Sequence, residues 1–118
     1  MHPQLELLLE IQDLQTQRRA LAEEPLAGVE EELFELSPEE ALRLLDEKVE
    51  ELADRLAGPV AARWRDVSTT LDRAVAPVLN GVCYGCFVAV PTAWSSEPGR
   101  NERIRVCDQC GRFLYYLD

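Results

Sequence analysis

The sequence is poor in histidine and lacks long apolar runs. Its one histidine is His2, next to the first residue, so no Ser/His/Asp or Cys/His catalytic set can be assembled; we expect a protein that is not an enzyme. No apolar run is long enough to span a membrane. Glu6 and Glu10 interrupt the leucines near the first residue, so this stretch lacks the basic-then-apolar pattern of a signal peptide. We therefore expect a cytoplasmic protein without membrane association.

Basic residues are also scarce: the chain has 12 basic and 22 acidic residues, which gives a formal net charge of −10. Residues 1–80 contain 18 acidic and 8 basic residues and carry the whole excess, whereas residues 81–118 contain four of each. An acidic segment repels phosphate backbones, so residues 1–80 are expected to face protein or solvent. A nucleic-acid contact would be weak and would use residues 81–118.

Two seams of apolar residues predict paired helices. The first, in a helix over residues 3–24, is spaced 4, 3, 4, 3 and consists of Leu7, Ile11, Leu14, Arg18 and Leu21. Arg18 must extend to solvent or meet a carboxylate. Ser37-Pro38 is a strong helix start, and the second seam, in a helix over residues 38–57, consists of Leu42, Leu45, Val49, Leu52 and Leu56. Two matched seams predict an antiparallel hairpin of the coiled-coil type.

A third helix is expected over residues 59–73, after Gly58-Pro59 ends or kinks the second. Its apolar face consists of Val60, Trp64, Val67 and Leu71. The first helix is too short to cover this face. The face therefore packs either on the cysteine-containing segment or on a second copy of the chain, which would make the protein a homodimeric scaffold.

All four cysteines lie in two C-x-x-C pairs with twenty residues between them: Cys83, Cys86, Cys107 and Cys110. Each pair lets one tight turn direct two sulfurs to a point, and four thiolates are the tetrahedral set of a structural zinc. This predicts one Zn²⁺ with no coordination position open for a substrate. The alternative, two disulfides, requires an oxidising compartment.

Short strands are expected around the cysteines. Residues 75–78 look extended, Asn80-Gly81 is a hairpin-type turn, and residues 103–106 and 113–117 follow as strands. We expect an α+β protein with an N-terminal helical arm (residues 1–73) and a small antiparallel-β ribbon (residues 74–118). So small a ribbon needs a metal to fold.

Residues around the cysteines match a known pattern: Val75-Ala76-Pro77-Val78, Gly81, Val88, Pro91, Val106 and Gly111-Arg112-Phe113-Leu114-Tyr115. With the four cysteines, this segment resembles the bacterial C4-type zinc-ribbon family, whose members place the ribbon after a coiled-coil hairpin. The arm is shorter here than is usual in that family. The resemblance implies a non-enzymatic adaptor or regulator that contacts nucleic acid or the transcription machinery.

Two surfaces are candidate contact sites. The predicted hairpin tip is acidic and resembles that of DksA-type and Gre-type factors, which insert such a tip into the RNA polymerase secondary channel; a solvated acidic face is the alternative. The tip residues are Glu30, Glu31, Glu32 and Glu35. In the ribbon, arginines accompany aromatic side chains, as in single-strand binders, or the aromatics form the ribbon's own core. These residues are Arg100, Arg103, Arg105, Arg112, Trp94 and Tyr116.

Overall fold

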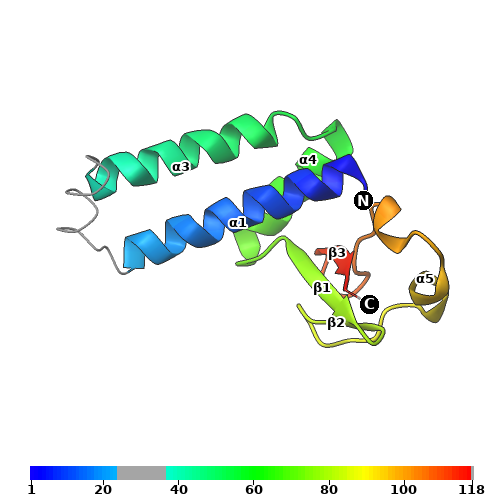
Figure 1. Ribbon diagram of the computed structural model, residues 1–118. Helices are drawn as coiled ribbons and strands as arrows, with labels where there is room; N and C mark the ends of the chain where they lie inside the picture. Colours follow the sequence, from blue (N-terminus) through cyan, green and yellow to red (C-terminus); the bar gives the residue numbers. More distant parts are fainter. Residues whose placement is uncertain (24–36, 118) are drawn as a thin grey trace.

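The computed structural model describes residues 1–23 and 37–117, and the predicted acidic tip at Glu30, Glu31, Glu32 and Glu35 lies outside them. The fold is α+β, with the N-terminal helices packed together and extending away from a small sheet (Figure 1). The elements are α1 (Pro3–Glu23), α3 (Pro38–Ala53), α4 (Gly58–Thr70), β1 (Val75–Leu79), β2 (Val82–Cys83), α5 (Thr92–Ser96), the 3-10 helix η1 (Arg100–Glu102) and β3 (Phe113–Tyr116).

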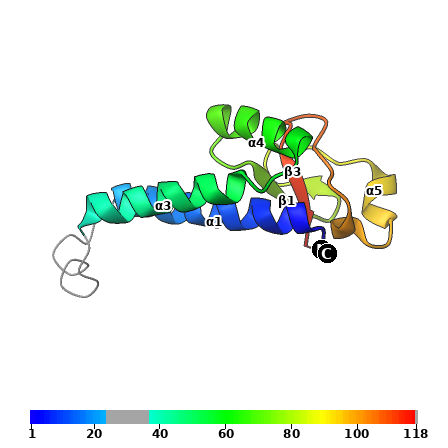
Figure 2. The same cartoon turned by 90° about the horizontal axis from the view of Figure 1, so that it is seen from above.

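Helices α1 and α3 run antiparallel, side by side, in both views (Figures 1 and 2). Ser37 caps α3 as predicted, since its hydroxyl accepts a hydrogen bond from the Glu40 amide at 3.2 Å. Arg18 meets a carboxylate: its Nε lies 2.6 Å from Asp46 on α3. Among the described residues, no helix is both long and apolar enough to cross a bilayer.

The predicted face of the third helix is used inside the chain. Trp64 and Val67 on α4 are 4% and 5% exposed, and Val60 and Leu71 pack at the edge of the same core. That core continues without a break from the helices into the sheet, where it takes in Val75 and Phe113. The apolar face therefore joins the helical arm to the ribbon within one chain.

The sheet has the order β2-β1-β3 and is mixed, not purely antiparallel as expected. Strands β1 and β2 form the predicted two-residue hairpin: Asn80 and Gly81 both have a positive φ, as a type I′ turn requires, and Leu79 pairs with Val82. Strand β3 pairs with β1 in parallel, from Val75 opposite Phe113 onward. Parallel pairing needs a long crossover, and the segment that carries both cysteine pairs supplies it.

The strand predicted over residues 103–106 does not form; only Val106 makes an isolated bridge, to Phe113. Backbone groups at the outer edge of β3 form hydrogen bonds with other partners instead. The Leu114 amide donates to the Arg105 carbonyl at 2.9 Å. The Asn101 side chain accepts from the Tyr116 amide and donates to its carbonyl, both at 2.8 Å, and so takes the place of a neighbouring strand.

Candidate metal centre

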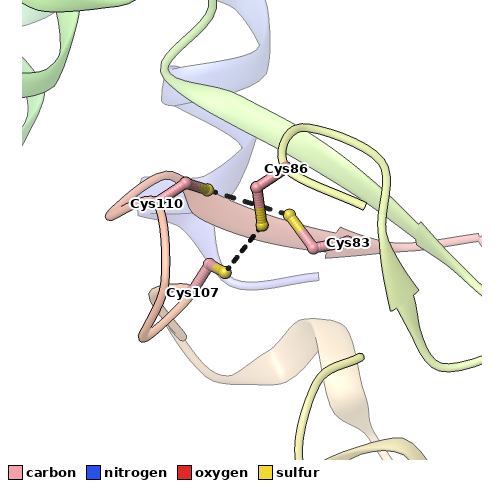
Figure 3. Close-up of side chains that lie close together, drawn as sticks. All are labelled: Cys83, Cys86, Cys107 and Cys110. Atoms are coloured by element: carbon pink, nitrogen blue, oxygen red, sulfur yellow. Dashed lines mark hydrogen bonds between the residues drawn. The ribbon is translucent and has the colours of Figure 1, made fainter. Parts of the chain in front are cut away.

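The four cysteine sulfurs converge on one point from two loops, one that begins at the end of β2 and one that precedes β3 (Figure 3). All lie within 4.8 Å of one another; Cys83 Sγ is 3.9 Å from Cys110 Sγ, and Cys86 Sγ is 3.7 Å from Cys107 Sγ. A metal–sulfur bond of about 2.3 Å places tetrahedral sulfurs about 3.8 Å apart, which these distances match. They are far from the about 2.05 Å of a disulfide. The four residues can hold a metal ion.

The two loops, the first knuckle (residues 83–87) and the second knuckle (residues 107–111), repeat one backbone pattern. The Phe87 amide donates to the Cys83 carbonyl at 2.7 Å, and the Gly111 amide donates to the Cys107 carbonyl at 2.9 Å. The donating residue has a left-handed φ in each case, 61° at Phe87 and 80° at Gly111. Glycine suits this conformation, so Gly111 was predictable, whereas the left-handed Phe87 was not.

Gly85 has an ordinary φ, and its lack of a side chain leaves room for Arg112. A Cβ at this position would come within 2.8 Å of the Arg112 side chain and 3.1 Å of the Ala76 Cβ. The Arg112 side chain crosses here from the second knuckle over the first, and its Nε donates to the Arg73 carbonyl at 2.8 Å. Arg112 therefore connects both knuckles to the chain that precedes β1.

The protein environment affects the individual thiols differently. Burial raises the pKa of Cys83 to about 12, although hydrogen bonds from the amides of Cys86 and Gly85 act to lower it. Burial also raises the pKa of Cys86. Burial opposes ionisation of Cys110 as well, but the amide and guanidinium of Arg112 both hydrogen-bond to this sulfur, and its pKa falls to about 7. Sequence reasoning had assigned Arg112 to a contact surface and missed this role.

Comparison with known proteins supports the fold. No protein-family model matches the chain, and no curated protein matches it either. The solved structure of CT398 from Chlamydia trachomatis is 24% identical over 67% of this chain, with a TM-score of 0.55. The HP0958 protein of Helicobacter pylori is 21% identical over 86% of the chain, with a TM-score of 0.56.

The chain spans only 34% and 41% of the lengths of those two proteins. At these identities the likeness concerns the fold alone. The helix-plus-small-sheet fold and the cysteine cluster agree with the resemblance seen in the sequence. Membership of the C4-type zinc-ribbon family stays a prediction.

The six residues predicted as a contact surface are not one surface. Arg112 lies at the cysteines, whereas Arg105 stacks over Trp94, with its Cζ 4.6 Å from the ring centroid. The same guanidinium donates to both carboxylate oxygens of Glu97, at 3.1 and 2.9 Å. Two of the predicted residues therefore hold the segment that contains α5 in place.

Arg100 and Tyr116 form a second internal pair. The Arg100 Cζ lies 5.4 Å from the Tyr116 ring centroid, and its Nη1 donates to the Ser95 carbonyl at 3.0 Å. Tyr116 is buried. Arg103 is the most exposed of the four arginines, and its Nη1 lies 4.0 Å from the nearer carboxylate oxygen of Glu97. Most of these side chains have contacts inside the ribbon, which leaves little of the predicted basic and aromatic surface for a ligand.

Replacing Arg112 with glutamine is expected to weaken metal binding about 10- to 100-fold, the usual cost of losing a group that supports a metal ligand. The change removes the charge beside Cys110 and the bond to the Arg73 carbonyl, but keeps the backbone amide that bonds to the sulfur. Competition with a chromophoric zinc chelator measures the affinity. Arg103→Gln is the matched control and should bind like the wild type; equal affinities for all three proteins would contradict the assigned role.

Metal affinity is expected to fall steeply below pH 7. The metal-free protein holds protons on at least Cys83 and Cys86, whose pKa values are raised, whereas the metal-bound form holds none on its ligands. Lowering the pH therefore favours the metal-free form. We expect the affinity to drop by at least about 100-fold per pH unit between pH 7 and 6. A drop of less than tenfold in the same chelator competition would contradict this proton count.

Proposed function

We propose that this protein is a non-enzymatic adaptor, in which one structural Zn²⁺ shapes the ribbon and a partner protein binds to the exposed surface around it. The observation that carries the proposal is the meeting of four cysteine sulfurs within 4.8 Å of one another. Four thiolates fill a tetrahedral coordination sphere, so the metal has no position for a water molecule or a substrate. A closed site of this kind supports a structural role.

The surface chemistry favours a protein partner over a nucleic acid. The chain carries a net charge of −10. Arg100 and Arg105 have contacts within the ribbon, and Arg112 donates to the Arg73 carbonyl. A tetrathiolate site with a bound divalent ion keeps a net negative charge. The resemblance to the C4-type zinc-ribbon family supports a partner in the transcription machinery as the finer version of the proposal.

Metal analysis and affinity capture test this function. The purified protein should contain one zinc per chain, and the tagged protein should recover a specific protein partner from its own cells. Core RNA polymerase, recovered by the wild type and lost when Glu30, Glu31 and Glu32 are changed to glutamine, would identify a channel-binding factor. An absence of zinc, or of any specific protein in the capture, would contradict the adaptor function.

A further inference from the structure

Phe87 in the first knuckle has a left-handed backbone conformation, although its side chain is largely exposed. Its φ is 61°, and the residue is 72% exposed to solvent. A bulky side chain in the left-handed region costs on the order of 1 kcal/mol, and the equivalent position of the second knuckle is Gly111. Because the ring is not buried, the stability of the ribbon does not explain it. An exposed, strained aromatic side chain indicates a contact with another molecule.

Two neighbours extend this apolar surface. Tyr84 and Val88 are 45% and 41% exposed, and the Tyr84 ring centroid lies 5.6 Å from that of Phe87, with the planes tilted by 56°. These three side chains come from five consecutive residues of one short loop. Aromatic side chains are enriched where proteins bind one another, and they often carry most of the binding energy there.

A pocket of about 450 Å³ lies beside Tyr84, which belongs to its wall. Its apolar lining comes from Val75, Ala76 and Pro77 of β1 together with Gly85. The β1 backbone in this wall is already occupied: the Val75 amide donates to Gln12, and the Pro77 carbonyl accepts from the Tyr84 amide. Pro77 itself has no N–H, so a peptide cannot extend the sheet at this edge. A ligand must be recognised through its side chains.

The charged lining of the pocket consists of two basic residues, Arg73 and Arg112, and one acidic residue, Asp72. The pocket is therefore basic although the chain as a whole has a net charge of −10. Neither guanidinium has a carboxylate partner within residues 1–23 and 37–117. The Arg112 guanidinium already donates from its Nε to the Arg73 carbonyl at 2.8 Å. Arg73 is therefore the cation that remains for an acidic group of a ligand.

We propose that Tyr84, Phe87, Val88 and the adjoining pocket form a docking site for an extended acidic peptide segment of a partner protein. An apolar side chain of the peptide covers the two rings, and a neighbouring carboxylate meets Arg73. This site rests on the proposed adaptor function and specifies its binding surface. A nucleic acid is disfavoured, because its phosphates would lie beside the tetrathiolate centre of an acidic protein.

The test uses a display library of random ten-residue peptides selected on the zinc-loaded full chain. We expect enrichment of sequences in which a large apolar residue adjoins Asp or Glu, with binding that weakens as salt is raised. Phe87→Gly removes the ring but keeps a backbone conformation that Gly111 also adopts, so the fold should be retained. Phe87→Gly and Arg73→Glu should each weaken binding at least tenfold; Leu44→Gln and Arg103→Glu, at exposed positions elsewhere, should not.

The proposal is overturned if the selection enriches no peptides or basic ones, or if Phe87→Gly leaves the affinity unchanged in a protein that still binds zinc. It is also overturned if an oligothymidylate binds more tightly than the peptides and loses affinity in Phe87→Gly, which would make the site one for nucleic acid. Affinity capture from cells distinguishes the docking site from the adaptor function. If the wild type and Phe87→Gly recover the same partner equally, this docking site is excluded and the adaptor function is retained.

Discussion

Replacing Cys107 with serine is expected to unfold most of the chain, not the ribbon alone. The loss of one ligand removes most of the metal's contribution, which is about 10–16 kcal/mol in small zinc-folded units. This is as large as the total stability of about 5–15 kcal/mol that is usual for a domain. Cys107 is buried, and Phe113, six residues later, belongs to the same core as Leu5 and Leu8 of α1. Loss of the ribbon therefore exposes the core of the helices.

The measurement is the far- and near-ultraviolet circular dichroism of the purified variant, with its zinc content. We expect loss of zinc, of the aromatic signal and of most of the helical signal, because an isolated pair of helices is marginal in water. Asp108→Ser, at an exposed position next to the ligand, is the control and should fold normally. A Cys107→Ser protein that keeps its full helical signal would show that the arm folds independently of the ribbon.

Local signals in the sequence were sufficient for the three longest described helices, the turn and the cysteine cluster. The Ser37-Pro38 start, the Asn80-Gly81 turn and the two C-x-x-C pairs each depend on a few adjacent residues whose conformation is set by their own chemistry. The pairing of Arg18 with a carboxylate also followed, because a charge in an apolar seam has few alternatives.

Features that depend on contacts between distant residues could not be predicted. The parallel pairing of β3 with β1 and the hydrogen bonds of the Asn101 side chain to Tyr116 arise from tertiary packing, and the helix α5 lies in a segment for which no element was predicted. Arg112 was assigned to a surface, because arginine near aromatics suggests ligand binding; only the folded chain shows that it reaches Cys110. The left-handed Phe87 has no signal in composition or periodicity.

Trp64 connects the arm to the ribbon, and its truncation is the second change with a large expected effect. It is 4% exposed, and its cluster includes Ile11 of α1, Leu52 of α3 and Val75 of β1. Because the surrounding elements are held by their own hydrogen bonds, they cannot collapse fully into the space that an alanine would leave. The cost is therefore both the lost burial of the indole and an internal cavity.

Trp64→Ala is expected to lower the free energy of unfolding by about 3–5 kcal/mol, which corresponds to a melting temperature at least about 12 °C lower. Thermal and urea unfolding of the zinc-loaded protein measure this, and arm and ribbon should unfold in one transition because they share the core. Leu44→Ala, at an exposed position on α3, is the control and should change the stability little.

The same variant separates an internal contact from a contact between chains. Since Trp64 and Val67 are buried within one chain, Trp64→Ala should sediment like the wild type while being much less stable. A variant that dissociated from dimer to monomer with unchanged thermal stability would place the face at an interface between copies instead. Addition of zinc should raise the melting temperature of Trp64→Ala, because the metal binds only the folded ribbon and so shifts the equilibrium toward it.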